Sequence, residues 1–126
     1  MDKDIRKVLI IDDELDICVL LSGILRILGI KATFSTTLQE GIKRLSDEDF
    51  ELLFLDINLP DGSGMETLPR IKVLNPELNV IMISAYDGES ERRQAREKGA
   101  LDFISKPFST NKIKEKLKNH FTGLNL

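Results

Sequence analysis

Three continuous apolar runs constrain the fold of this chain more than any other feature. They are Val8–Ile11, Leu52–Leu55 and Val80–Ile83, and each is the length of a strand, far short of a membrane span. A strand with one face in water alternates polar and apolar residues, whereas these runs have no polar position. Such runs are typical of strands buried on both faces of a parallel sheet.

The segments between these runs carry helical patterns. Apolar spacing and terminal signals predict helices over Glu14–Leu28, Thr37–Leu45, Gly64–Leu74, Ser90–Lys98 and Thr110–Phe121. Two weaker strands are predicted over Lys31–Ser35 and Leu101–Ser105. Strand and helix therefore alternate along the 126 residues, which predicts one α/β domain with a parallel sheet covered by helices on both faces.

Composition disfavours several classes of protein. Cys18 and His120 are the only cysteine and histidine, so we expect no internal disulfide, no zinc cluster and no Ser/His/Asp triad. Cys18 falls in an apolar helix and is expected to be packed. The start of the chain has no apolar signal region, which predicts a cytoplasmic protein without a membrane partner. A net charge of −3 predicts no direct nucleic-acid binding.

Polar side chains follow four of the five predicted strands. Asp12 and Asp13 follow the first strand, Asp56 the third, Ser84 the fourth and Lys106 the fifth. In open parallel sheets, ligands bind outside the carboxyl ends of the strands. We therefore expect these carboxylates, the hydroxyl and the ammonium group to gather at one edge of the sheet.

The chemistry of that set indicates phosphoryl transfer. Crowded carboxylates raise one another's pKa unless a cation neutralises them, and Mg²⁺ accepts carboxylate and carbonyl oxygens while keeping several waters. A carboxylate can then attack phosphorus and form an acyl phosphate, with the Lys106 ammonium stabilising the transferred charge. Alone, each residue has a plainer interpretation: Asp13 could cap the following helix, and Asp56 could be a turn residue.

Four segments together resemble the receiver domain of bacterial two-component response regulators. They are Val8–Glu14, Leu55–Met65, Met82–Ala85 and Phe103–Phe108. The resemblance extends from about Lys7 to Phe121. It implies a flavodoxin-like, five-stranded parallel sheet in the order 2-1-3-4-5, and a single receiver domain over residues 1–126 with a core of about 7–121.

The resemblance also implies a role for each matching residue. Asp56 would be the phosphoacceptor, and Asp12, Asp13, Asp56 and the backbone carbonyl of Asn58 would hold Mg²⁺, or Mn²⁺ in its place. Lys106 and Ser84 would bind the phosphoryl group, Ser84 and Phe103 would be the switch pair, and Asn58 and Tyr86 would tune the phosphoryl lifetime. Ser84 would move toward the phosphoryl oxygen, and Phe103 would then rotate inward.

The resemblance implies partners as well. A histidine kinase or a histidine phosphotransfer protein would supply the phosphoryl group, in a reaction where the domain catalyses only its own phosphorylation and slow dephosphorylation. The surface of the fourth helix, fifth strand and fifth helix would then change and bind a second copy or an output partner. Basic side chains line both helices, and they suit either a partner surface or a solvated face. They are Arg92, Arg93, Arg96, Lys98, Lys112, Lys114, Lys116 and Lys118.

Three other functions fit parts of the sequence less well. A degenerate receiver could act as a docking scaffold, but the acidic set and Lys106 are intact. An aspartyl-phosphate hydrolase of the haloacid-dehalogenase type needs a second Asp two residues after the nucleophile, where this chain has Asn58. A flavodoxin-type flavin module needs a Ser-, Thr- and Gly-rich loop after the first strand, where the acidic segment Asp12–Glu14 would repel phosphate.

Overall fold

The computed structural model describes residues 6–86 and 88–121. Its main sheet has five parallel strands in the order β2-β1-β3-β6-β7. They are β1 (Lys7–Ile11), β2 (Lys31–Ser35), β3 (Leu52–Asp56), β6 (Asn79–Ser84) and β7 (Asp102–Ser105). This is the predicted order 2-1-3-4-5, because β6 and β7 are the fourth and fifth strands of this sheet along the chain. Strands β4 (Asn58–Leu59) and β5 (Gly62–Ser63) are not part of this sheet, because they form a separate short antiparallel hairpin.

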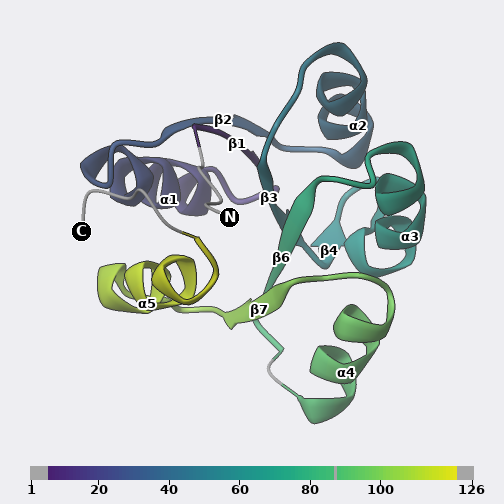
Figure 1. The fold of residues 1–126 in the computed structure, drawn as a ribbon. Helices are drawn as coiled ribbons and strands as arrows, with labels where there is room; N and C mark the ends of the chain where they lie inside the picture. The colour runs from purple at the N-terminus through teal and green to yellow at the C-terminus, as the bar shows by residue number, and fades with distance from the viewer. Residues whose placement is uncertain (1–5, 87, 122–126) are drawn as a thin grey trace.

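Five helices connect the strands and cover both faces of the sheet. They are α1 (Leu15–Ile27), α2 (Leu38–Asp47), α3 (Gly64–Leu74), α4 (Glu89–Glu97) and α5 (Thr110–His120). Figure 1 shows α1 and α5 on one face and α2, α3 and α4 on the other. Every predicted helix is confirmed, with ends that differ by at most two residues, as expected where helix termini fray.

The core consists of two apolar layers, one on each face of the sheet. Alternate residues of a strand point to opposite faces, so Val8 and Ile10 of β1 join the layer under α1 and α5, while Leu9 and Ile11 join the layer under α2, α3 and α4. All four side chains are 0% exposed. The absence of polar positions in the three apolar runs thus follows from burial on both faces.

Helix α1 ends in a turn that requires a left-handed residue. Gly29 has φ +81°, its N–H donates to the carbonyl of Arg26 over 3.0 Å, and the Ile30 N–H donates to the carbonyl of Leu25 over 2.9 Å. This is the Schellman arrangement, in which glycine avoids the steric cost of a Cβ. Gly29 therefore terminates the helix, and the chain turns directly into β2.

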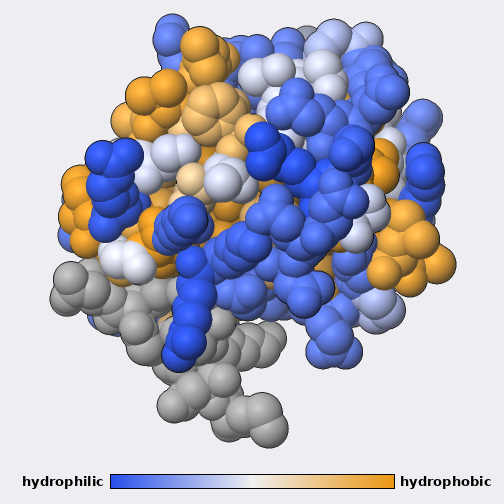
Figure 2. Space-filling view, turned by 90° about the horizontal axis from the view of Figure 1, so that it is seen from above, coloured by the Kyte–Doolittle hydropathy of each residue, from blue (hydrophilic) through white to orange (hydrophobic). Residues whose placement is uncertain are grey.

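The outer surface of α1 is unusually apolar for a helix facing solvent. Leu15, Val19, Leu20 and Ile27 are each at least 48% exposed, and Figure 2 shows hydrophobic residues gathered on the side where Figure 1 places α1.

In the described part of the chain, none of the helices is both long and apolar enough to pass through a lipid bilayer.

Candidate metal centre

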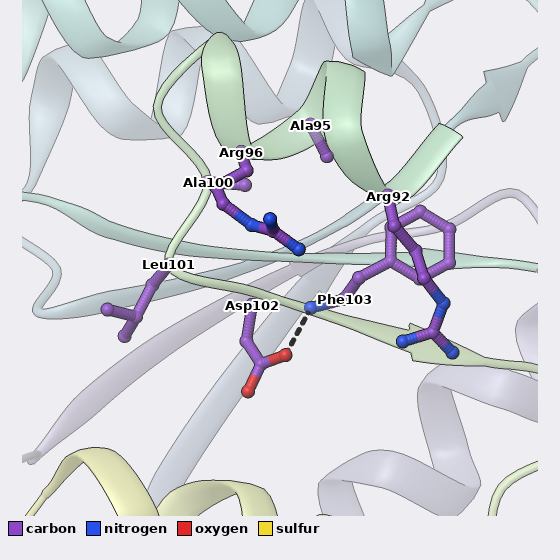
Figure 3. Close-up of a pocket in the computed structure, with 7 residues that line it drawn as sticks. All are labelled: Arg92, Ala95, Arg96, Ala100, Leu101, Asp102 and Phe103. Atoms are coloured by element: carbon purple, nitrogen blue, oxygen red, sulfur yellow. Dashed lines mark hydrogen bonds between the residues drawn. The ribbon is translucent and has the colours of Figure 1, made fainter. Parts of the chain in front are cut away.

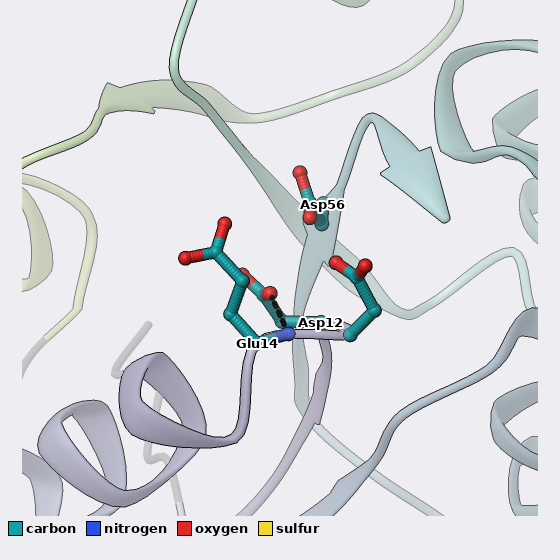
Figure 4. A group of neighbouring side chains, drawn as sticks. Asp12, Glu14 and Asp56 are labelled. Carbon is teal, nitrogen blue, oxygen red and sulfur yellow. Dashed lines mark hydrogen bonds between the residues drawn. The ribbon is translucent and has the colours of Figure 1, made fainter. Parts of the chain in front are cut away.

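Four carboxylates meet at the carboxyl ends of β1 and β3. One oxygen from each of Asp12, Asp13, Glu14 and Asp56 lies within 4.8 Å of the others, and Figure 4 shows Asp12 and Glu14 after β1 close to Asp56 at the end of β3. Asp12 is 0% and Asp56 5% exposed, while Asp13 and Glu14 are exposed. The three predicted carboxylates are therefore brought together, and Glu14 joins them.

Lys106 supplies positive charge to this cluster. Its Nζ lies 2.9 Å from Oδ2 of Asp12, 3.1 Å from Oε1 of Glu14 and 3.4 Å from Oδ2 of Asp56. Burial alone would lower the pKa of Lys106, but the hydrogen bond to Asp12 and the neighbouring negative charges outweigh it and raise that pKa. Lys106 therefore keeps its charge at every physiological pH.

Asp56 occupies a site that disfavours its own ionisation. Burial, followed by the charge of Asp12, raises the pKa of Asp56 to about 7, although Lys106 and the backbone N–H of Asn58 act in the opposite direction. The positive charge of Lys106 thus does not balance the negative charge of these carboxylates. Clustered carboxylate oxygens with excess negative charge are suited to a hard divalent cation, so the donor set fits the metal that the family resemblance implies.

Two backbone N–H groups hold the segment after β1, one by donating to β2 and the other by donating to the Asp12 side chain. The Asp12 N–H donates to the carbonyl of Ser35 over 3.1 Å, and the Glu14 N–H donates to Oδ1 of Asp12 over 2.8 Å. The N-cap residue of α1 is Glu14, which makes no side-chain capping bond. The interpretation of Asp13 as the helix cap is therefore wrong, because α1 begins one residue later than predicted.

The loop after Asp56 folds back tightly on the phosphoacceptor candidate. Its hairpin pairs Asn58 with Ser63, and the Gly64 N–H donates to the carbonyl of Ile57 over 2.7 Å. A Cβ at Gly64 would lie 2.0 Å from the backbone oxygen of Asp56. Only glycine therefore fits here, because of this close approach. The hairpin within this loop was not predicted from the sequence.

Ser84 and Tyr86 lie at the same edge of the sheet. Asp56 pairs with Ile83 in the register of β3 and β6, and Ser84 is the next residue along β6. Ser84 is 1% exposed, and its Oγ accepts a hydrogen bond from the Tyr86 N–H over 3.0 Å. Tyr86 itself is exposed.

Phe103 on β7 already lies inside the core in this structure, in the inward position that the family resemblance gave to the phosphorylated state. It is 4% exposed, and the guanidinium carbon of Arg92 lies 5.4 Å from the centre of its ring. An Arg92 nitrogen also donates to Oγ of Ser105 over 3.3 Å. Arg92 and Phe103 line a small hollow of about 60 Å³ between α4 and β7, which Figure 3 shows with Arg92 beside the ring and Arg96 further along α4.

Asp102 organises a second charged group that sequence reasoning missed. Its carboxylate accepts hydrogen bonds from Nζ of Lys116 over 2.9 Å and pairs with Nε2 of His120 at 2.8 Å. Burial raises the pKa of Asp102, but its hydrogen bonds to His120 and Lys116 more than offset this and lower it. Lys116 and His120 are therefore tied to the edge strand. These contacts could not be predicted from a local sequence pattern, because Lys116 and His120 lie 14 and 18 residues from Asp102.

Fold and site together define a class of protein. The chain is a doubly wound α/β domain with a cluster of carboxylates and a lysine at the carboxyl ends of its strands, where ligands bind in such sheets.

Known proteins share this arrangement. Residues 8–118 match the family model of the response regulator receiver domain. The response regulator PilR of Pseudomonas aeruginosa is 36% identical over 110 residues, which are 87% of this chain and 25% of PilR. Sporulation initiation phosphotransferase F of Bacillus subtilis is 29% identical over 114 residues, which are 90% of this chain and 92% of that protein. The beryllofluoride-activated NtrC4 receiver domain dimer superposes with a TM-score of 0.86 at 34% identity, covering 91% of this chain and 95% of that one.

The chain therefore belongs to the response regulator receiver domain family, and its fold and phosphoacceptor switch role are those of two-component signalling. It spans about a quarter of the length of the transcriptional regulatory protein ZraR and of the response regulator protein PilR.

Proposed function

We propose that Asp56 is the phosphoacceptor of this chain and that Mg²⁺ is the cation beside it. The observation that carries the proposal is the position of Asp56, which is 5% exposed and clustered with Asp12 and Asp13. Asp12, Asp13, Asp56 and the backbone carbonyl of Asn58 would hold the ion. When bound, Mg²⁺ would neutralise these carboxylates and accept phosphoryl oxygens.

The residues of this chain suit a single displacement at phosphorus. A carboxylate oxygen of Asp56 would form the new bond to the phosphorus of a phosphohistidine. The P–N bond would break, and its electron pair would remain on the imidazole nitrogen, which takes up a proton from solvent. Lys106 would stabilise the transferred charge without giving up a proton, because its pKa is raised.

Ser84 would read the phosphorylated state. Its hydroxyl can donate to a phosphoryl oxygen on Asp56, a contact that exists only after phosphorylation and can therefore shift the conformational equilibrium. That movement would change the Ser84–Tyr86 hydrogen bond and the packing of Phe103. Asn58 and Tyr86, both exposed beside the site, would tune the lifetime of the phosphoryl group by controlling access of water.

The phosphoryl donor would be a histidine kinase or a histidine phosphotransfer protein. Leu15, Val19 and Leu20 are exposed on α1, and α1 begins directly after the acidic cluster. A donor that covered these side chains would therefore also cover the site. The domain would act on its own phosphoryl group only, in the cytoplasm.

The output surface would be formed by α4, β7 and α5. The NtrC4 receiver domain, in its beryllofluoride-activated form, is described as a dimer. This chain carries exposed basic side chains such as Arg93 and Arg96 on α4 and Lys112 on α5, which suit a second copy or an output partner.

The intact mass of the chain after incubation with acetyl phosphate tests the proposal. We expect one added phosphoryl group when Mg²⁺ is present, and none without Mg²⁺ or in Asp56→Asn. Asp49→Asn, which changes an exposed carboxylate outside the cluster, is the matched control and should be modified like the wild type. An equal gain in Asp56→Asn would contradict the assignment, and no gain in any sample would favour the docking-scaffold alternative.

A further inference from the structure

We infer that Asp61 is a positioning residue for the metal site, an inference that rests on the proposed function. Asp61 connects the loop after the phosphoacceptor to the beginning of α2, and α2 in turn contacts the strand that leads to Asp12. The carboxylate of Asp61 would therefore set the distance between the two halves of the ligand set.

The contacts of Asp61 with α2 are direct and paired. Its Oδ1 accepts the N–H of Leu38 over 2.9 Å, and its Oδ2 accepts the N–H of Gln39 over 2.9 Å. These are two of the first N–H groups of the helix, which have no acceptor within the helix itself. Thr37 takes a third, since its hydroxyl accepts the Glu40 N–H over 3.1 Å. A carboxylate held by two donors at a positive helix end has a fixed orientation.

Asp61 belongs to the same short hairpin as the proposed ligand Asn58. It lies in the turn between β4 and β5, where Asn58 pairs with Ser63 and Leu59 with Gly62. A Cβ at Gly62 would lie 3.0 Å from Cδ1 of Leu38, so the hairpin also contacts α2 closely. A shift of the turn relative to α2 would consequently move the backbone of Asn58.

Helix α2 also contacts the strand that leads to the first half of the site. At Gly41 the helix backbone approaches β1 so closely that a Cβ would lie 2.3 Å from Cδ1 of Ile11, the residue before Asp12. The Asp12 N–H also donates to the carbonyl of Ser35 over 3.1 Å, just before the helix. The first turns of α2 therefore contact both the strand that leads to Asp12 and the hairpin that carries Asn58, and Asp61 supplies the polar connection to that hairpin.

A comparison of two capping variants separates positioning from helix stability. Asp61→Ala and Thr37→Ala each remove side-chain acceptors from the start of α2, but only Asp61→Ala disconnects the hairpin. Mg²⁺ binding is measured by the shifts of the Asn58 and Gly64 amide signals in an NMR titration. We expect about tenfold weaker Mg²⁺ binding in Asp61→Ala, as is typical when a residue that orients metal ligands is lost, and wild-type binding in Thr37→Ala.

Asp61→Asn gives a second, milder test. The amide oxygen of asparagine can accept one of the two helix N–H groups, but its NH₂ group would face the other N–H and cannot accept it. We expect its Mg²⁺ affinity to lie between those of the wild type and Asp61→Ala. Equal Mg²⁺ affinities in Asp61→Ala and Thr37→Ala would overturn the inference about Asp61. The proposed function would still stand in that case, provided that the unmodified chain binds Mg²⁺. Failure of the wild type to bind Mg²⁺ would overturn both.

Discussion

Asp56 illustrates how single residues are set by their surroundings in this domain. Its carboxylate shares a small volume with that of Asp12, and the one ammonium group of Lys106 is divided among Asp12, Glu14 and Asp56. Ionisation of Asp56 is therefore unfavourable unless a further positive charge binds beside it. Such perturbed groups are characteristic of functional sites.

The raised pKa of Asp56 predicts that Mg²⁺ binding depends on pH near neutrality. Because Mg²⁺ binds the ionised carboxylate, its affinity should fall about tenfold for each pH unit below about 7 and level off above it. Calorimetric titrations with Mg²⁺ between pH 5.5 and pH 8.5 (roughly the range in which Asp56 titrates) measure this. A flat affinity across that range would contradict the prediction.

The same pKa predicts an effect on stability in the absence of metal. Asp56 binds its proton more tightly in the folded chain than in the unfolded chain, where its pKa is near 3.8. Its contribution to stability therefore increases as pH falls from about 7 toward that value. We expect Asp56→Asn to raise the free energy of unfolding at pH 8, by roughly 2 kcal/mol, in urea titrations with a chelator present. A variant less stable than the wild type at that pH would show that the ion pair with Lys106 outweighs burial and repulsion.

Helices α1 and α3 each contain a glycine without a positive φ, Gly23 and Gly64. The space around these two glycines differs. At Gly64, where α3 begins, an added Cβ would meet the backbone of Asp56. At Gly23, within α1, an added Cβ meets nothing within 4 Å. The same chemical change should therefore destabilise one element and stabilise the other.

We expect Gly64→Ala to cost roughly 3 kcal/mol of unfolding free energy, since the backbone must move to relieve the overlap. Gly23→Ala should instead add up to about 1 kcal/mol, because alanine is the better helix former and no neighbour has to move. Chemical denaturation of both variants measures the difference. Similar stabilities for the two would be evidence against the close approach of α3 to Asp56.

At the scale of the whole molecule, the domain joins an acidic site to a distant basic surface. Phe103 lies on the strand that leads to Lys106, and Arg92 of α4 covers its ring. Under the proposed function, a change at Ser84 or Lys106 would therefore reach α4 and α5 through one edge of the sheet. Asp102 fastens α5 to that strand through Lys116 and His120, so the two elements can respond together.

This arrangement predicts assembly in the activated state. Sedimentation of the chain with beryllofluoride and Mg²⁺ should show a dimer whose stability depends on ionic strength, because exposed charges are screened by salt. Arg96→Glu on α4 should weaken the dimer, whereas Lys43→Glu on α2 should not. A monomer at every salt concentration, with and without beryllofluoride, would contradict the assignment of this surface to self-association.

Much of the fold and the proposed ligand set could be predicted from sequence. Continuous apolar runs specify strands buried on both faces, and strand–helix alternation specifies a parallel sheet. Carboxylates that directly follow such strands share one edge of the sheet, so the order of elements places Asp12, Asp13 and Asp56 there. That they meet depends on β1 and β3 being neighbours, which the family resemblance implied.

Only the tertiary structure decided which distant side chains meet. Glu14 reaches Lys106 across 92 residues, Asp61 binds the start of α2 across 22 and 23 residues, and Asp102 pairs with His120 across 18. Periodicity describes which face of an element is buried. It contains no information on the distance between two polar groups on different elements, because helix packing and loop paths set that distance.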